Sequence, residues 1–416
     1  MLSSAATTDM DFASDWEELK EAFNSGGVQE VGALLERKLD KWKQIPLNVA
    51  VIGRSGVGKS SFINAIRLVD ADHEDGAPVG VNETTVTVDR IRSYPHPCNP
   101  LLEFWDLPGV GTDRCPRETY LSDIQVDRFD FFLLITADRF TQDDTWLGRE
   151  FDKRNKKYFF VRTKVGADIS NNKKAHPKTH KEDDVVRDIR ESTRERLKEN
   201  GCENVLVFLI DSYKVQKFDF DLLKLRLIED FPELKKAALV LSLQATSKEM
   251  IDRKVAVLRS RMWKLAALSG AVAVIPVPLV SIAIDRVIVT RESKFYITQL
   301  GLDKTSLKRY AELANTDYKN LKTIVVSILG GFDIRALVDT CVKVATLMAT
   351  TAAKEGLKFL PLIGSLIVAP ASYRGTYCAL ELVLDKTERV ALEVAECAAE
   401  SAASACCDEP DDDDEP

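Results

Sequence analysis

The feature that most constrains this chain is a glycine-rich segment, residues 53–60, which matches the pattern G-x-x-x-x-G-K-[ST]. An apolar run at residues 47–52 precedes it, and an amphipathic segment at residues 61–66 follows it. A strand, this loop and a helix in that order form a phosphate-binding loop. Its backbone amides surround a phosphate at the helix N-terminus, where the partial positive charge of the helix is concentrated. The sequence therefore predicts a nucleotide site built into an α/β sheet.

Two side chains of this loop carry most of the expected chemistry. We expect the Lys59 ammonium group to bridge the β- and γ-phosphates and to act in catalysis, and the Ser60 hydroxyl to ligate magnesium. The remaining loop residues and the next one along the chain are expected to contact the nucleotide. The predicted set is Gly53, Arg54, Ser55, Gly56, Val57, Gly58, Lys59, Ser60 and Ser61.

Further elements follow in the order that a GTP-binding protein requires. Asp106 begins a D-x-x-G pattern that ends at Gly109, so Asp106 would hold magnesium through water and the Gly109 amide would sense the γ-phosphate. Between the two motifs, Thr85 is predicted as a switch residue that ligates the same metal and contributes to catalysis. Thr163 and Lys164 end a later strand, as the guanine-recognition motif [NT]-K-x-D does.

Two positions depart from these patterns. The last residue of the guanine-recognition motif is Gly166 instead of an aspartate that would accept hydrogen bonds from guanine N1 and N2. Losing that charged contact weakens guanine selectivity by about 1–3 kcal/mol, unless Asp168 reaches the base instead, and Gly166→Asp is expected to sharpen selectivity. Val110 stands where Ras-like enzymes have a glutamine that orients the attacking water, so we expect slow hydrolysis by a single chain.

The spacing of apolar segments predicts the fold and its domains. Short apolar runs at residues 47–52, 101–105, 131–136, 158–163 and 205–210 alternate with helical segments such as 185–200, which indicates a mostly parallel, Ras-like sheet. The following residues read as consecutive helices. We expect these segments: 1–10 disordered, 11–45 N-terminal helices, 46–232 GTPase domain, 233–407 C-terminal helical domain, and 408–416 an acidic disordered tail.

Charge and hydropathy narrow the class of protein. The net charge is −8, but the last nine residues hold seven acids and no base, so the body is nearly neutral and gives no sign of nucleic-acid binding. Residues 265–284 lack charges over a span long enough to cross a membrane. Because Pro276 and Pro278 interrupt that segment, two buried helices joined by a turn are favoured over an integral membrane protein. For Cys406 and Cys407, S-acylation is the alternative to free thiols.

The combined motifs resemble those of the immunity-related (p47-type, interferon-inducible) GTPases, a dynamin-like family. The similar segments are residues 80–85 (GVNETT), 94–97 (YPHP), 104–112 (FWDLPGVGT), 162–165 (RTKV), 273–278 (AVIPVP) and 360–365 (LPLIGS). The resemblance implies a helical domain built from both chain ends, and GTP-driven dimers or oligomers formed through the GTPase domain. It also implies a cytoplasmic protein that contacts vacuolar or organelle membranes peripherally in cell-autonomous immunity. Because the N-terminus has no glycine at position 2 for myristoylation, we expect an amphipathic helix within residues 300–360 to make the membrane contact.

The resemblance also extends to individual residues. Asp211 and Ser212 lie in a segment similar to the family's base-binding loop, where a serine usually follows the strand, and both are expected to contact the nucleotide. Glu83 is a candidate catalytic residue that would contact a second protomer's ribose or polarise water; a solvent-facing loop acid is the other interpretation. The leading hypothesis is a slow, self-assembling GTPase that uses GTP, GDP and Mg²⁺. The alternative is a degenerate scaffold or regulator that binds nucleotide with weak guanine selectivity and hydrolyses little.

Overall fold

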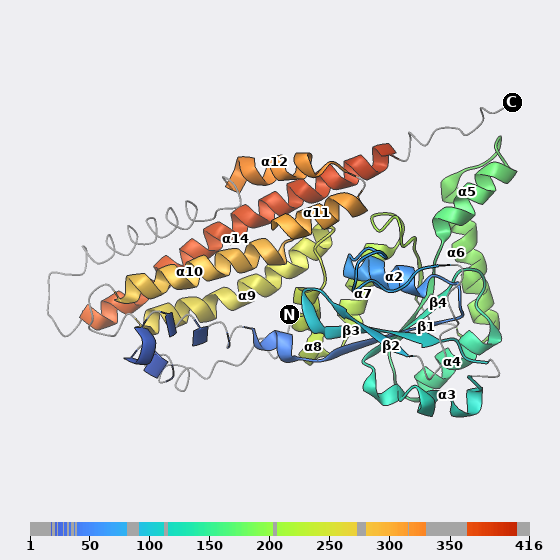
Figure 1. The fold of residues 1–416 in the computed structure, drawn as a ribbon, viewed down its shortest axis with the longest axis horizontal. Helices are drawn as coiled ribbons and strands as arrows, with labels where there is room; N and C mark the ends of the chain where they lie inside the picture. The colour runs from blue at the N-terminus through green and yellow to red at the C-terminus, as the bar shows by residue number, and fades with distance from the viewer. Residues whose placement is uncertain are drawn as a thin grey trace. The chain divides into compact units, whose positions relative to one another are not determined.

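A computed structural model of the chain describes residues 40–80, 91–111, 115–202, 206–272, 280–314, 316–329 and 364–405, with scattered positions between 18 and 37. The chain divides into two compact units. The sheet unit comprises residues 45–243, and the helical unit comprises residues 1–44 together with 244–416 (Figure 1). The helical unit is thus built from both chain ends, as the resemblance implied.

Six strands form one mostly parallel sheet in the order β2-β3-β1-β4-β5-β6. The strands are β1 (Leu47–Gly53), β2 (Arg92–His96), β3 (Asn99–Pro108), β4 (Phe131–Thr136), β5 (Tyr158–Arg162) and β6 (Val207–Leu209). Every predicted apolar run overlaps a strand, and these five strands, β3, β1, β4, β5 and β6, pair in parallel with one another. Because parallel strands point the same way, the segments that follow β1, β3, β5 and β6 emerge at one edge of the sheet.

The edge strand β2 was not predicted as a strand, and it pairs antiparallel to β3. Its sequence, RSYPH, has no apolar run, and its residues are mostly exposed or half-buried. Pro95 lacks an amide hydrogen, which restricts proline to sheet edges, and here its carbonyl accepts a 3.0 Å hydrogen bond from Nε of Arg67. An exposed edge strand of this composition carries little of the hydrophobic pattern on which the prediction relied.

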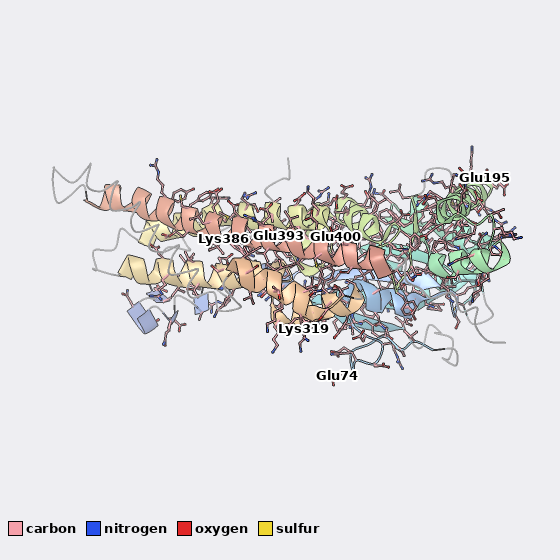
Figure 2. The ribbon with its side chains drawn as sticks, turned by 90° about the horizontal axis from the view of Figure 1, so that it is seen from above. Glu74, Glu195, Lys319, Lys386, Glu393 and Glu400 are labelled. Carbon is pink, nitrogen blue, oxygen red and sulfur yellow. The ribbon has the colours of Figure 1, made fainter. Side chains whose placement is uncertain are left out.

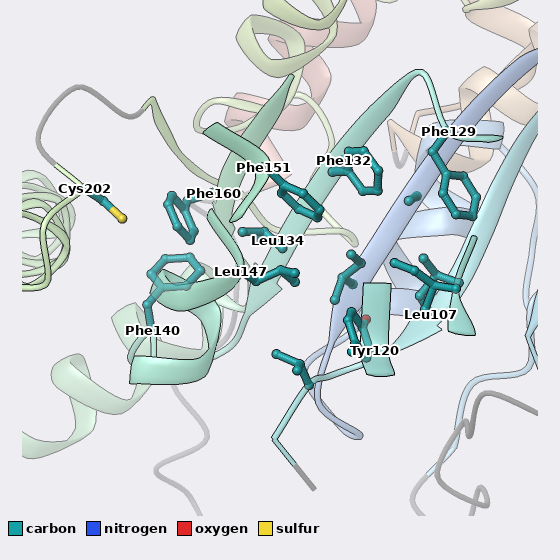
Figure 3. Close-up of a cluster of buried hydrophobic side chains, with 14 of the residues drawn as sticks. Leu107, Tyr120, Phe129, Phe132, Leu134, Phe140, Leu147, Phe151, Phe160 and Cys202 are labelled. Atoms are coloured by element: carbon teal, nitrogen blue, oxygen red, sulfur yellow. The ribbon is translucent and has the colours of Figure 1, made fainter. Parts of the chain in front are cut away.

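Helices cover the sheet and enclose a core rich in phenylalanine. They are α2 (Lys59–Arg67), α3 (Arg117–Asp123), α4 (Gln142–Lys153), α5 (Val165–Ala175), α6 (Glu182–Glu199), α7 (Phe220–Asp230) and α8 (Glu233–Ser242), with the short 3₁₀ turn η4 (Val126–Arg128). Another short 3₁₀ turn, η2 (Lys41–Gln44), belongs to the helical unit. In the cluster of Figure 3, Phe132 stacks on Phe151 with ring centroids 4.1 Å apart, and Phe140 meets Phe160 edge-on at 4.6 Å. Aromatic pairs of this kind add to area burial and fix the position of the strands.

The sheet unit continues through α8 to Leu243, beyond the end at residue 232 that the sequence suggested. The Lys235 ammonium group binds both carboxylate oxygens of Asp130, at 2.8 and 2.9 Å, and the Pro46 carbonyl at 2.7 Å. On the same helix, the Ser242 hydroxyl accepts a 2.8 Å hydrogen bond from the buried Asn99 amide on β3. These polar contacts between distant positions give no periodic signal in the sequence, so the pattern of apolar residues could not locate this boundary.

Long helices make up the helical unit. The described ones are α9 (Lys248–Val272), α10 (Val280–Gln299), α11 (Lys304–Leu313), α12 (Tyr318–Leu329) and α14 (Gly364–Ala405). One face of α14 is buried against α9, α10 and α12 because buried, mostly apolar residues recur every three or four positions: Leu380, Val383, Leu384, Thr387, Ala391, Val394 and Ala398. Figure 2 shows Lys386, Glu393 and Glu400 along the outer side of this helix.

The N-terminal segment packs on α10. Trp42 in η2 is 5% exposed, its ring centroid lies 6.4 Å from that of Phe295, and Asp40 pairs with Arg291 at 3.7 Å. The helix α9 is described as far as Val272 and α10 from Val280, and the turn predicted between them lies at residues 273–279, outside the described residues. Within the described helices, none has both the length and the apolar content that crossing a bilayer requires.

A buried ion pair lies inside this bundle. The Arg261 guanidinium on α9 is 3.3 Å from the Glu292 carboxylate on α10, and the two side chains are 9% and 1% exposed. The guanidinium also stacks over the Phe295 ring, 4.3 Å from its centroid. Burial raises the pKa of Glu292, although Arg261 and Arg291 oppose the shift. Desolvation therefore offsets much of the attraction within this pair.

Candidate nucleotide-binding site

The phosphate-binding loop connects the end of β1 to the start of α2. Gly58, at the N-cap of α2, has a φ of 93°, a left-handed conformation that favours glycine. The loop residues 54–56 are exposed, whereas Val57 and Lys59 are buried. The first amides of α2 are thus directed out of the helix at the carboxyl edge of the sheet. This geometry suits a phosphate group, as the sequence predicted.

Lys59 occupies the centre of this loop. Its ammonium group donates a 3.2 Å hydrogen bond to the Arg54 carbonyl, and it lies 3.6 Å from Oδ1 of Asp106 at the end of β3. Its side chain is 7% exposed, and burial lowers the pKa of Lys59 while the Asp106 carboxylate opposes that shift. A cation held across the loop in this way can neutralise phosphate charge without first being ordered.

The donor set beside Lys59 fits a magnesium ion. Ser60 follows it at the first turn of α2, and Asp106 is 4% exposed on the neighbouring strand, where it is paired in register with Val51. A hydroxyl and a carboxylate are hard oxygen ligands of the kind that Mg²⁺ prefers. Thr85, the third predicted ligand, and Glu83 lie outside the described residues.

The D-x-x-G segment lies against the phosphate-binding loop. A Cβ atom added at Gly109 would lie 3.1 Å from the backbone nitrogen of Arg54, so a larger residue would push the two segments apart. The next side chain, Val110, is 4% exposed and belongs to the hydrophobic cluster that includes Leu107 and Tyr120. The side chain at position 110 therefore faces the hydrophobic core.

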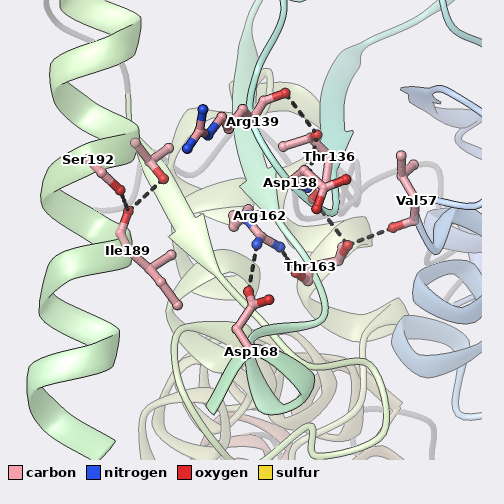
Figure 4. Close-up of polar contacts among 10 residues, drawn as sticks. Val57, Thr136, Asp138, Arg139, Arg162, Thr163, Asp168, Ile189 and Ser192 are labelled. Atoms are coloured by element: carbon pink, nitrogen blue, oxygen red, sulfur yellow. Dashed lines mark hydrogen bonds and ion pairs between the residues drawn. The ribbon is translucent and has the colours of Figure 1, made fainter. Parts of the chain in front are cut away.

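Thr163 connects the guanine-recognition segment to the phosphate-binding loop. Its hydroxyl lies 2.6 Å from the Val57 carbonyl and 3.1 Å from the Thr136 carbonyl, and its own amide donates to Thr136 at 2.8 Å (Figure 4). Lys164 follows at the N-cap of α5, exposed and with a φ of 59°. The motif threonine thus has a structural role that fixes the loop, which the sequence motif did not reveal.

Asp168 is engaged in an ion pair. Its carboxylate lies 2.5 Å from Nη2 of Arg162, whose other nitrogen Nη1 donates to the Thr163 carbonyl (Figure 4). Burial raises the pKa of Asp168, and Arg162 counteracts this shift. To contact a base, Asp168 would have to leave this pair. Its own amide donates a 3.2 Å hydrogen bond to the Lys164 carbonyl, so Asp168 lies beside the guanine-recognition segment with its carboxylate held by Arg162.

The loop after β6 closes the site on the other side of α5. The Val165 amide donates to the Ile210 carbonyl at 3.3 Å, which places Asp211 and Ser212 beside the start of α5. Asp211 is 8% exposed, and its Oδ1 accepts a 2.9 Å hydrogen bond from the Tyr213 amide.

Tyr213 is a further candidate site residue, which the sequence analysis did not assign. Its side chain is 75% exposed, and its hydroxyl lies 3.4 Å from the Ser61 hydroxyl on α2. An exposed aromatic ring beside a purine site can stack on the base. The only signal in the sequence was an aromatic residue directly after the base-binding loop.

Comparisons with known proteins agree with this geometry. A family described as "Interferon-inducible GTPase (IIGP)" matches residues 13–391. Interferon-inducible GTPase 5 of Bos taurus is 33% identical over 380 residues, which cover 91% of this chain and 81% of the relative. Interferon-inducible GTPase 1 of Mus musculus is 35% identical over 286 residues, or 69% and 68% of the two chains. Immunity-related GTPase family M protein 2 of the same species is 28% identical over 237 residues, which cover 57% of this chain and 58% of the relative.

Proposed function

The chain belongs to the interferon-inducible GTPase family, and on that premise we propose that it hydrolyses GTP slowly and assembles with further copies of itself on intracellular membranes. GTP and GDP are the nucleotides that its family membership implies. The observation that carries the proposal is the buried Lys59 ammonium group, held between the Arg54 carbonyl and the Asp106 carboxylate at the start of α2.

The residues act by positioning and charge. Lys59 and the first amides of α2 bind the phosphates, and the Gly109 amide lies where it can follow the γ-phosphate. When bound, Mg²⁺ supplies charge neutralisation at the β- and γ-phosphate oxygens. Ser60 and Thr85 are its proposed direct ligands, and Asp106 is its proposed ligand through water.

A direct test is phosphate release by the purified chain in the presence of magnesium. Lys59→Ala should abolish turnover because phosphate charge is then left unbalanced in a closed site. Lys153→Ala is a matched control, since Lys153 is a surface lysine of the same unit, paired with Glu150 at 2.6 Å. Equal turnover by the wild type and Lys59→Ala would show that the activity arises elsewhere.

Slow hydrolysis by single chains follows from the buried Val110 side chain, which leaves that position without a group to orient water. We propose that a second GTPase unit completes the site and that Glu83 contributes from the switch region. Specific activity should then rise with protein concentration, and Glu83→Ala should flatten the rise while nucleotide affinity stays nearly unchanged. Constant specific activity over about a hundredfold range of concentration would exclude the dimer mechanism.

Peripheral membrane contact has a candidate surface on α11 and α12. Their apolar sides are buried, whereas Lys304, Lys308, Lys319 and Lys322 are exposed. Figure 2 places Lys319 on the outer side of the bundle. Clustered lysines attract anionic lipid headgroups by about 1 kcal/mol each. Replacing these lysines by glutamate should reduce sedimentation with phosphatidylserine vesicles, and unchanged sedimentation would remove this surface from the proposal.

A role in cell-autonomous innate immunity follows from the family. Its test is growth of an intracellular pathogen in cells that lack the protein and in cells rescued with the wild type or with Lys59→Ala. The competing function is a nucleotide-binding scaffold with weak guanine selectivity and little hydrolysis, which Gly166 favours. A chain that binds GTP and ATP equally and releases no phosphate would support the scaffold.

A further inference from the structure

The guanine-recognition motif lacks its aspartate, so another group must recognise the base if guanine is bound selectively. Gly166 lies in the first turn of α5, three residues after Thr163, at the position where the motif supplies a carboxylate. A carboxylate there accepts hydrogen bonds from the N1–H and N2–H groups of guanine, which adenine does not present in that arrangement. Without a replacement, the site would have no charged acceptor for this edge of the base.

The structure places another carboxylate in the same position. A Cβ atom built on Gly166 would overlap Oδ2 of Asp211 and would lie 3.3 Å from its Cγ atom. The carboxylate of Asp211 thus occupies the space in which the side chain of an aspartate at position 166 would begin. Residues 166 and 211 are coupled, because a side chain at position 166 would require the Asp211 carboxylate to move from its present position.

The hydrogen bonds of Asp211 leave one oxygen for a ligand. Oδ1 accepts the Tyr213 amide at 2.9 Å, which fixes the side-chain rotamer. Within the part of the chain that the structure describes, no donor is hydrogen-bonded to Oδ2. An 8% exposed carboxylate with such an oxygen is a strong acceptor for paired N–H donors.

The surroundings connect this carboxylate to the phosphate site. Tyr213, two residues after Asp211, meets Ser61 at the start of α2, and Thr163, three residues before Gly166, binds the Val57 carbonyl. Both sides of the Gly166–Asp211 pair are therefore anchored to the phosphate-binding loop. The competing acid, Asp168, is held by Arg162 at 2.5 Å.

We propose that Asp211 replaces the absent motif aspartate and selects guanine. The carboxylate has moved from α5 to the loop after β6, and Gly166 provides the space for it. The chain therefore keeps a guanine preference, in contrast to the weakened preference that Gly166 alone suggested. This inference rests on the proposed GTP binding and adds the residue that determines base specificity.

The decisive variant is Asp211→Asn, measured by displacement of a fluorescent GDP analogue with GDP, IDP and XDP. Asparagine keeps the acceptor oxygen for the Tyr213 amide, so the loop conformation is retained. Its amide nitrogen donates where the carboxylate accepted, which suits the C2 carbonyl of xanthine and opposes the C2 amino group of guanine. We expect GDP affinity to fall about 10- to 100-fold and XDP to bind more tightly than GDP.

Two outcomes would overturn the proposal. One is an Asp211→Asn protein that still prefers GDP over XDP as strongly as the wild type. The other is an equal loss of affinity for all three nucleotides, which would show that Asp211 only supports the loop. Asp168→Asn is the matched control, and it should leave the order of the three nucleotides unchanged.

A reciprocal exchange tests the coupling of the two positions. Asp211→Ser should lose guanine preference, and Gly166→Asp alone should destabilise the unit because its side chain overlaps Asp211. The double variant Gly166→Asp/Asp211→Ser should regain the preference for guanine, because it has the motif aspartate at position 166 and a small serine at position 211. Failure of the double variant to bind GDP better than Asp211→Ser would contradict the exchange. If the wild type binds none of these nucleotides, the proposed function itself fails. That result differs from a wild type that binds them and variants that do not change their order of affinity.

Discussion

The Thr163 hydroxyl offers a quantitative test of how the nucleotide site is held together. Thr163 is 1% exposed, and its hydroxyl links the guanine-recognition segment to the Val57 carbonyl of the phosphate-binding loop at 2.6 Å. In Thr163→Val the side chain keeps its shape but the donor is lost. The Val57 carbonyl then has no hydroxyl partner in a region closed to water, which costs about 1–3 kcal/mol of unfolding free energy.

Thermal unfolding monitored by circular dichroism measures this effect. The sheet unit spans residues 45–243, and for a unit of this size each kcal/mol lowers Tm by about 2–4 °C. The transition that rises when GDP is added identifies the sheet unit, because a ligand stabilises only the unit that binds it. We expect Thr163→Val to lower this Tm and also to shrink the rise caused by GDP, since the loop is less well ordered.

Thr163→Ser serves as the control because it keeps the hydroxyl and removes only a methyl group. It should restore most of the GDP-induced rise in Tm. The reasoning would be refuted if Thr163→Val changed the unfolding free energy by less than about 0.5 kcal/mol, the range of ordinary surface substitutions, and left the response to GDP intact.

The remaining predictions concern the two cores. Val110→Gln should destabilise the sheet unit by about 1–3 kcal/mol without raising turnover, because position 110 faces the core; a faster enzyme in the phosphate-release assay would contradict this. Arg261→Met alone should lower the free energy of unfolding, measured by urea denaturation, by about 3–5 kcal/mol. The double variant Arg261→Met/Glu292→Met should lower it much less, because it leaves no unpaired buried charge. Equal losses in the two variants would contradict this expectation. Since the folded pKa of Glu292 is raised above its usual value of 4.5, its contribution to stability is greatest below about pH 4.5 and is lost as pH rises through the folded pKa. Glu292→Gln should therefore remove the loss of stability with rising pH that Glu292 causes. A pH dependence of stability that is unchanged in this variant would show that other groups produce it.

Periodic and local features of the fold were predictable from the sequence. The apolar runs of β1 and β4 and the glycine-lysine-serine loop follow from burial and from backbone geometry, so they leave a signature in neighbouring residues. The strand β2 has no such signature in its sequence, because an edge strand that contains Pro95 needs no apolar face.

The base-recognition part of the site was only partly predictable. Gly166 looked like a lost function when considered alone, since Asp211 is distant along the chain and the overlap of the two positions exists only in the folded protein. The sequence suggested Asp168 as the substitute, but it could not reveal that Arg162 already pairs with that carboxylate. Contacts between loops at the sheet edge depend on the packing of strands β5 and β6, which no local pattern encodes.

The central claim is that this chain binds guanine nucleotides through the phosphate-binding loop around Lys59. Calorimetric titration of the wild type with GDP and with ADP, both with magnesium, tests it most directly, with Lys59→Ala measured under the same conditions. The account predicts saturable binding of GDP, an affinity for ADP at least about 100-fold lower, a gap of roughly 3 kcal/mol, and no measurable binding to Lys59→Ala. Equal binding of GDP and ADP, or undiminished binding to Lys59→Ala, would contradict it.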